Sequence, residues 1–213
     1  MTKSEYYFIG IAGNIGVGKT TMTDIIASHF NWKPFYESVI DNPYLEDFYD
    51  DMRRWSFNLQ IYFLSNRFKT HKDMTEGDFS AVQDRTIYED VEIFARILYE
   101  MGNMTKRDWE NYQELFRIMT SYLKSPNLII YLRASVDTLL TRIKKRSRGF
   151  EREISPEYLY QLNIAYERWI KEEQKRHTPI MIIESDTFNV FEDKDKLDDI
   201  FESIREYCPV NHL

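Results

Sequence analysis

The feature that most constrains the fold of this chain is a glycine-rich segment near its start. Four of the seven glycines fall within nine residues: Gly10, Gly13, Gly16 and Gly18. A short apolar run, Tyr6–Ala12, precedes this segment, and apolar residues recur at helical spacing after it, over Thr20–Phe30. The sequence therefore predicts a strand, a tight backbone loop and a helix, in that order.

The loop fits a phosphate-binding pattern, a glycine followed by four residues and then by Gly-Lys-Thr. Its residues are Gly13, Asn14, Ile15, Gly16, Val17, Gly18, Lys19 and Thr20, with Thr21 next in the helix. Backbone N–H groups of such a loop turn toward phosphate oxygens, and the positive end of the helix adds to the attraction. We expect Lys19 to contact the β- and γ-phosphates of a nucleoside triphosphate and the Thr20 hydroxyl to bind Mg²⁺.

Composition excludes several classes of protein. The 28 basic and 35 acidic side chains give a net charge of −7, which argues against a nucleic-acid partner. No apolar run approaches the roughly 20 residues that span a bilayer, which argues against a membrane partner. A single cysteine, Cys208, fits a reducing compartment. We expect one domain over residues 1–213, in the cytoplasm.

Strand-like and helix-like segments alternate along the chain. The further strand-like runs are Lys33–Tyr36, Phe79–Gln83, Asn127–Leu132 and Pro179–Glu184. The helix-like segments between them are Trp55–Met74, Thr86–Met101, Arg107–Lys124, Val136–Arg146, Pro156–Arg176 and Phe191–Tyr207. This alternation predicts an α/β fold of three layers, a five-stranded parallel sheet flanked by helices on both faces.

Two carboxylates follow predicted strands. Glu37 closes the second strand, and Asp84 follows the third, directly before Arg85. The ends of parallel strands open on one crevice, so both carboxylates should lie beside the phosphate loop. One would sit near the metal, and the other would take a proton from an acceptor hydroxyl. From spacing alone, each could equally be a helix cap or a surface ion pair.

Together these residues resemble the deoxynucleoside kinase family. The resemblance covers nearly the whole chain and rests on four groups of residues besides the phosphate loop. They are Glu37 with Val39 and Asn42-Pro43-Tyr44; Trp55-Ser56-Phe57 with Gln60 and Arg67; Asp84-Arg85-Thr86 with Asp90; and Arg142, Arg146 and Arg148. The family resemblance implies a P-loop kinase fold with an arginine-rich lid, here at about residues 142–155.

The resemblance implies transfer of the γ-phosphoryl group of ATP to the 5′-hydroxyl of a deoxynucleoside, with Mg²⁺, as a step of nucleotide salvage. Glu37 would be the general base, and Arg85 would hold it. Lys19 and Arg85 would complete the catalytic set, and Thr20, Asp84 and Glu37 would form the metal side of the site.

The resemblance also assigns nucleoside contacts. Gln60 would pair with the base edge, as suits an amide, and Arg67 and Asp90 would hold the far edge of the base. Tyr49 and Glu151 would meet the sugar. Trp55 and Phe57 would wall the pocket, although aromatic residues at helical spacing are as often core residues.

The segment Arg142–Arg152 carries six cations in an acidic chain. Such a run is commonly a solvated face, but the family has its lid here, whose arginines Arg142, Arg146 and Arg148 would cover the phosphates and exclude water. The segment Asp186–Asn189 follows the last strand, where Asp186 and Phe188 would cover the ATP adenine.

Within the family, the charged pair Arg67 and Asp90 resembles the deoxycytidine, deoxyguanosine and deoxyadenosine branch, and the Asn42-Pro43-Tyr44 run resembles its bacterial members. The resemblance therefore implies a purine deoxynucleoside, deoxyadenosine first, then deoxyguanosine or deoxycytidine. A nucleoside monophosphate kinase and a non-catalytic nucleotide-binding regulator are the alternatives.

Apolar residues on the two long helices, among them Phe94, Ile97 and Leu98, suggest a homodimer formed by helix packing, as the resemblance also does.

Overall fold

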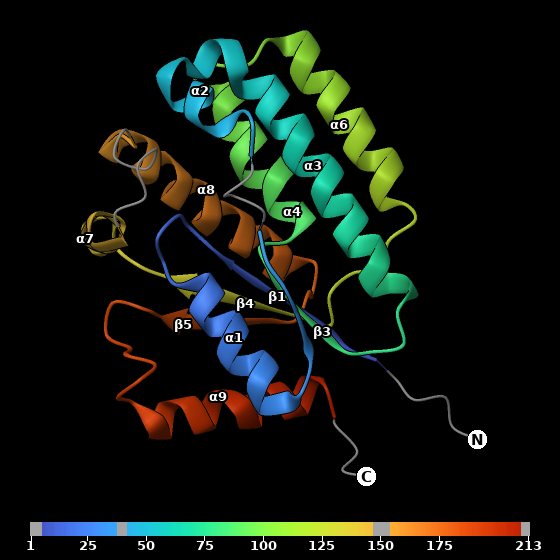
Figure 1. The fold of residues 1–213 in the computed structure, drawn as a ribbon, viewed down its shortest axis with the longest axis vertical. Helices are drawn as coiled ribbons and strands as arrows, with labels where there is room; N and C mark the ends of the chain where they lie inside the picture. Colours follow the sequence, from blue (N-terminus) through green and yellow to red (C-terminus); the bar gives the residue numbers. More distant parts are fainter. Residues whose placement is uncertain (1–5, 38–41, 147–153, 210–213) are drawn as a thin grey trace.

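The computed structural model describes residues 6–37, 42–146 and 154–209, and a parallel sheet forms its centre (Figure 1). Over these residues the strands lie in the order β2, β3, β1, β4, β5. Their bounds are β1 Phe8–Gly13, β2 Lys33–Phe35, β3 Ala81–Asp84, β4 Leu128–Arg133 and β5 Ile180–Glu184. Each neighbouring pair is parallel. The five-stranded parallel sheet predicted from the sequence is thus confirmed.

Helices cover both faces of the sheet (Figure 1). One face carries α1 (Lys19–Phe30) and α9 (Lys194–Tyr207). The other carries α2 (Leu45–Asp50), α3 (Met52–Glu76), α8 (Pro156–Lys175) and a continuous rod formed by α4 (Ile87–Glu89), η1 (Asp90–Ala95) and α5 (Arg96–Glu100). The helix α6 (Lys106–Thr120) packs outside α3, and α7 (Val136–Arg146) follows β4. None of the described helices is both long and apolar enough to cross a membrane.

The two faces of the sheet bury alternate residues of its strands. In β4, Leu128, Ile130 and Leu132 pack toward α1 and α9, whereas Ile129 and Tyr131 pack toward α8. Strands buried on both faces need apolar residues at nearly every position, which explains the continuous apolar run of β4.

Local sequence fixes several helix starts. The Ser155 side chain accepts a hydrogen bond from the Tyr158 N–H, with Pro156 at the first helical position of α8. Thr86 and Glu89 form a reciprocal capping box at the start of α4. This box begins the rod that follows β3, directly beside the Asp84–Arg85 pair.

The structure corrects some predicted elements. The predicted helix Thr86–Met101 contains a π-helical segment, η1, which periodicity cannot reveal. The helix α2 was not predicted, because six residues are too few for a periodic pattern. The last helix begins at Lys194 rather than Phe191, because the Asp193 side chain accepts a hydrogen bond from the Asn189 N–H and closes a turn there.

The close approach of β1 to the start of α4 gives a test of packing. A Cβ atom at Gly10 would lie 2.3 Å from Cγ2 of the buried Thr86. We expect Gly10→Ala to lower the free energy of unfolding by about 1–3 kcal/mol through overpacking. The loss should largely disappear when Gly10→Ala is compared in a Thr86→Ser background, because serine lacks Cγ2 and keeps the hydroxyl. Urea denaturation measures all four proteins, and an equal loss in both backgrounds would contradict the account.

Candidate active site

The phosphate loop joins β1 to α1 and depends on glycines for its path. Gly16 and Gly18 take φ angles of 85° and 107°, in the left-handed region that other residues avoid. A Cβ atom at Gly16 would also lie 2.7 Å from Cγ1 of Ile143 on α7. The loop is therefore seated against α7, and Lys19 at the start of α1 points back over it, donating from Nζ to the Asn14 carbonyl at 3.2 Å.

A hydroxyl and a carboxylate meet beside this loop. The Thr20 hydroxyl donates to Oδ2 of Asp84 at 2.6 Å. The other Asp84 oxygen, Oδ1, is buried and has no hydrogen-bond partner among the residues that the structure describes. Oxygen ligands of this kind, one carboxylate and one hydroxyl next to bound phosphates, are what Mg²⁺ takes in kinases. The side chains of Thr20 and Asp84 therefore fit a magnesium ion.

Buried opposite charges surround the second predicted carboxylate. Oε1 of Glu37 accepts hydrogen bonds from Nη1 of Arg85 and Nη2 of Arg67, both at 3.0 Å. Nε of Arg67 donates to Oδ2 of Asp90 at 2.6 Å. Two arginines and two carboxylates thus form a charge-balanced cluster at the ends of β2 and β3.

The same cluster sets the ionisation of Glu37. Burial would raise the pKa of Glu37, but Arg85 and then Arg67 and Lys19 outweigh it and hold the pKa at about 2. For Lys19, burial and the neighbouring Arg85 lower the pKa to about 8, against the opposite effect of Asp84 and Glu37. Glu37 is therefore ionised at neutral pH, and Lys19 is largely protonated.

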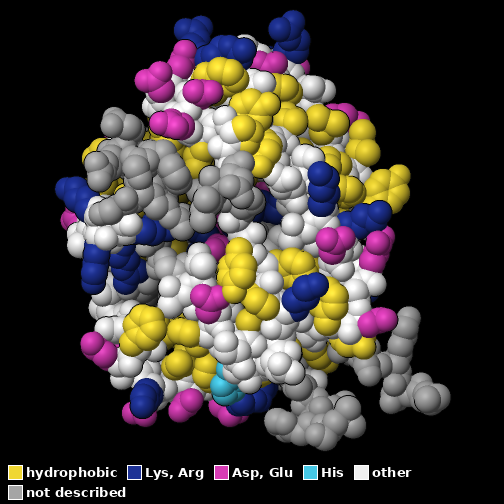
Figure 2. Space-filling model, in the orientation of Figure 1, with side chains coloured by type: hydrophobic (Ala, Val, Ile, Leu, Met, Phe, Trp, Pro, Cys, Tyr) yellow, Lys and Arg dark blue, Asp and Glu magenta, His cyan; other side chains and the backbone are white. Residues whose placement is uncertain are grey.

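A cavity of about 360 Å³ connects the phosphate loop with Glu37. Figure 2 shows the molecule hollowed at the centre of this face. On one side the cavity is lined by Ile15, Gly16, Gly18, Lys19, Thr20 and Thr21, and on the other by Glu37, Tyr49, Gln60 and Arg85. Its apolar wall consists of Leu45, Phe48, Leu59, Phe63, Phe94 and Tyr158. This volume suits a small organic ligand.

The structure brings most of the predicted nucleoside contacts to the cavity but not all. Gln60 is buried there, and its Oε1 has no partner in the described part of the chain. Trp55 and Phe57 do not line it: Trp55 packs against Tyr44, and Phe57 lies among the core residues around α6. Their role as pocket walls stays a prediction that the cavity lining does not support. The apolar wall includes two other aromatic residues, Phe63 and Phe94, which the sequence did not assign to the pocket.

Arg67 and Asp90 lie behind Glu37 rather than on the larger cavity. Arg67 lines an adjoining cavity of about 40 Å³, together with Gln83. Its guanidinium also donates to the Arg85 carbonyl at 3.2 Å. In this structure Arg67 thus forms ion pairs with Glu37 and Asp90. Sequence spacing did not indicate the pair with Glu37.

The predicted lid residues divide into two groups. Arg142 and Arg146 on α7 line the cavity, and Arg142 donates to the carbonyls of Val17 and Ser185 at 2.8 and 2.7 Å. Arg142 thereby holds the phosphate loop against the end of β5. Arg148 and Glu151 lie outside the described residues, as does half of the predicted lid, residues 147–153.

The residues predicted to cover the adenine lie away from the cavity. Asp186 accepts hydrogen bonds from the Ser135 N–H at 3.0 and 3.1 Å and so fixes the start of α7. Phe188 packs against the core between the sheet, α1 and α9. Neither lines the cavity, and for each the structure offers a packing or capping role.

A single cavity presents a phosphate loop to one end of a ligand and an ionised, arginine-held carboxylate to the other. That geometry suits the transfer of a phosphoryl group from a nucleoside triphosphate to a hydroxyl, and it defines a P-loop kinase.

Comparison with known proteins gives the particular family. Residues 9–209 match the deoxynucleoside kinase family. The chain is 39% identical to the deoxyadenosine/deoxycytidine kinase of Bacillus subtilis over 92% of this chain and 90% of that protein. It is 38% identical to the deoxyadenosine kinase of Dictyostelium discoideum over 95% and 82% of the two chains. The solved structure of deoxyadenosine kinase from M. mycoides with bound dATP matches at a TM-score of 0.81, with 32% identity over 93% and 99%.

The chain therefore belongs to the deoxynucleoside kinase family. It is an enzyme that phosphorylates a nucleoside to its monophosphate, with ATP as the donor that the family implies. The alternative of a non-catalytic regulator is wrong.

The low pKa of Glu37 predicts an acid sensitivity of folding. Because the folded-state pKa lies below the unfolded value, the stability that ionised Glu37 contributes is full above about pH 5 and is lost as the pH falls toward 2. We expect wild-type stability to fall more steeply between pH 5 and 3 than that of Glu37→Gln. Urea denaturation at several pH values measures both slopes, and parallel slopes would contradict the assignment.

Proposed function

We propose that this enzyme transfers the γ-phosphoryl group of ATP to the 5′-hydroxyl of a deoxynucleoside, with deoxyadenosine preferred. The observation that carries the proposal is the cavity that joins Lys19 and Thr20 to Glu37 and Gln60. Four relatives are named for deoxyadenosine, and others, from B. subtilis and Lactobacillus acidophilus, are named deoxyguanosine kinase at 36% and 35% identity. These names favour a purine deoxynucleoside as the substrate, but they do not distinguish deoxyadenosine from deoxyguanosine.

In the proposed reaction Glu37 orients the acceptor hydroxyl and receives its proton. A carboxylate with a pKa of about 2 is a weak base. Phosphoryl transfer passes through a loose transition state, so the hydroxyl need lose its proton only late, and a weak base can receive it. Arg85 and Arg67 hold Oε1 of Glu37, which leaves its second oxygen to face the hydroxyl.

On the donor side, Lys19 and the loop N–H groups would bind the phosphates, and Arg142 and Arg146 would add positive charge. Thr20 and Asp84 would hold Mg²⁺, which neutralises charge on the transferring group when it is bound. The metal role of Glu37 and the contacts of Arg148, Glu151, Asp186 and Phe188 with substrate stay predictions.

Gln60 supports the choice of base. Its buried, unpartnered Oε1 can accept a hydrogen bond from an exocyclic amino group, which adenine and cytosine both carry next to a ring-nitrogen acceptor. Leaving such a buried oxygen unpaired costs about 1–3 kcal/mol, enough to discriminate against a base that presents a carbonyl there. A purine also fills more of the apolar wall than a pyrimidine does, which favours deoxyadenosine.

The test measures ATP consumption with Mg²⁺ against deoxyadenosine, deoxyguanosine, deoxycytidine, thymidine, the ribonucleosides, thymidine monophosphate and no acceptor. We expect strong acceptor dependence, with deoxyadenosine giving the highest kcat/KM. A higher value for thymidine monophosphate would favour a nucleoside monophosphate kinase. Equal consumption without acceptor would overturn the proposal.

Glu37→Gln is the matched variant for the catalytic role, since the amide keeps the shape of the side chain. We expect it to bind ATP normally and to lose roughly 10²-fold or more in kcat, the usual scale of a lost general base. Near-normal turnover would remove Glu37 from this role.

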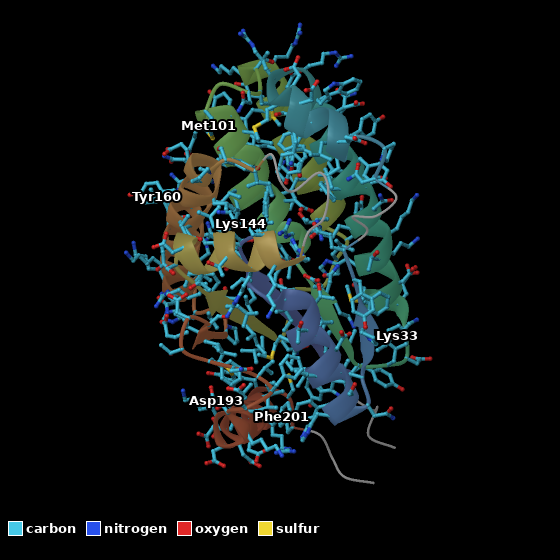
Figure 3. The ribbon with its side chains drawn as sticks, turned by 60° about the vertical axis from the view of Figure 1, so that its left-hand side comes forward. Lys33, Met101, Lys144, Tyr160, Asp193 and Phe201 are labelled. Atoms are coloured by element: carbon cyan, nitrogen blue, oxygen red, sulfur yellow. The ribbon has the colours of Figure 1, made fainter. Side chains whose placement is uncertain are left out.

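We also propose that residues 1–213 act as one domain in the cytoplasm and pair as a homodimer. Phe94, Ile97 and Leu98, which suggested a dimer from sequence, are buried inside the chain. Support now comes from the family resemblance and from exposed apolar residues: Met101 after α5 and Tyr160 on α8 lie on the same side of the molecule (Figure 3). Light scattering at micromolar concentration should give twice the chain mass, lowered by Tyr160→Glu, and a wild-type monomer would contradict the dimer.

A further inference from the structure

One fully buried carboxylate, Glu89 on α4, has no part in the mechanism above. Its Oε2 accepts hydrogen bonds from the Thr86 N–H at 2.7 Å and from the Thr86 hydroxyl at 3.2 Å. Its Oε1 accepts from the Gly13 N–H at 3.3 Å and from the Tyr166 hydroxyl at 2.8 Å. Glu89 therefore contacts the ends of two neighbouring strands, β1 and β3.

Capping of α4 explains only half of these contacts. A capping glutamate needs only to reach the N-cap residue, here Thr86. Burying a carboxylate is costly unless hydrogen bonds compensate it. The bonds to Gly13 and Tyr166 provide that compensation, and they join the helix start to the first residue of the phosphate loop.

Tyr166 completes the contact from the opposite side. Its hydroxyl lies 2.8 Å from the Gly13 carbonyl as well as from Glu89, so its single hydrogen is shared between these two acceptors. Both backbone polar groups of Gly13 thus contact this pair, the N–H through Glu89 and the carbonyl through Tyr166. The Tyr166 ring is itself fixed by stacking on Tyr131, with centroids 5.6 Å apart and planes 15° apart. Neither Glu89 nor Tyr166 is exposed to solvent.

The residues after β1 would bind the phosphate donor, and the residues after β3 contact the acceptor side of the site. Gly13 begins the loop for the donor phosphates, and Thr86 directly follows Asp84 and Arg85, which contact Thr20 and Glu37. We propose that Glu89 and Tyr166 are positioning residues that fix the phosphate loop relative to the Asp84–Arg85 pair, and so align donor with acceptor. The inference rests on the proposed function, because it concerns the alignment of the same transfer.

Tyr166→Phe tests this role, with Tyr131→Phe as the matched control. Tyr131 is the stacked neighbour, and its hydroxyl bonds Glu167 instead of Gly13. Because a misplacement of about 1 Å can cost about 10²-fold in rate, we expect Tyr166→Phe to lower kcat by roughly tenfold or more. KM for ATP and for the deoxynucleoside should each change less than about threefold, since the contacts with both substrates remain. Tyr131→Phe should stay within about twofold of wild type in kcat.

A second readout separates alignment from loss of folded protein. A smaller folded fraction would lower phosphoryl transfer and acceptor-independent ATP hydrolysis equally. Misalignment of donor and acceptor should instead raise the ratio of hydrolysis to transfer in Tyr166→Phe. An unchanged ratio, or a kcat like that of Tyr131→Phe, would overturn the inference.

Glu89→Gln provides a second route if Tyr166→Phe does not fold. The amide oxygen can still accept from the Thr86 N–H, but the amide nitrogen cannot accept from Gly13. The same fall in kcat and rise in the hydrolysis ratio are expected, at a melting temperature that shows a folded protein. If wild type is acceptor-dependent and Glu37→Gln shows its expected loss of kcat while Tyr166→Phe and Glu89→Gln behave like wild type, this inference fails and the proposed function stands. If wild type shows no acceptor dependence, the proposed function fails and the inference with it.

Discussion

The parallel pairing of β1 with β3 is the constraint on which the active site depends. Its register sets Ile11 opposite Asp84, so the phosphate loop that follows β1 and the Asp84–Arg85 pair that ends β3 emerge side by side. Gly10 allows this approach, because a side chain there would meet Thr86. The Thr20–Asp84 hydrogen bond and the Glu89 contacts join residues that this pairing brings together. The neighbouring β2–β3 pairing brings Glu37 to Arg85 in the same way. The sheet therefore sets the distance between the donor and acceptor sides before any ligand binds.

Buried charge then fixes the orientation of the acceptor side. Removing one member of a buried ion pair leaves an uncompensated charge, at a cost of about 3–5 kcal/mol. The cluster of Glu37, Arg67, Arg85 and Asp90 is balanced, so each side chain is held by the others. The cluster fixes the geometry of Glu37, because a carboxylate with two guanidinium partners has little freedom to rotate. Orientation of this kind suits a reaction in which the protein contributes mainly positioning.

Sequence patterns predicted the elements whose signals are local. The glycine loop, the strand ends at Glu37 and Asp84 and the order of strands and helices follow from spacing and periodicity. The contact of Arg67 with Glu37 joins α3 to the end of β2, and no local pattern encodes it. Trp55 and Phe57 show a second limit of sequence patterns. Helical spacing predicts that a face is buried, but it does not indicate whether the protein core or a ligand cavity lies against that face. The short helix α2 carries cavity residues, Leu45 and Phe48, on too few residues for a periodic signal.

The π-helical segment Asp90–Ala95 makes the length of this stretch as important as its composition. Each residue of an α-helix advances about 100° around the axis, so deleting one residue here would rotate everything beyond it relative to Glu89. Glu89 faces the phosphate loop and Asp90 faces Arg67, while Phe94 reaches the cavity wall. A single substitution in this segment changes one contact at a time. An insertion or deletion would instead change the donor side, the acceptor side and the pocket together, so evolution should tolerate substitutions here more readily than changes of length.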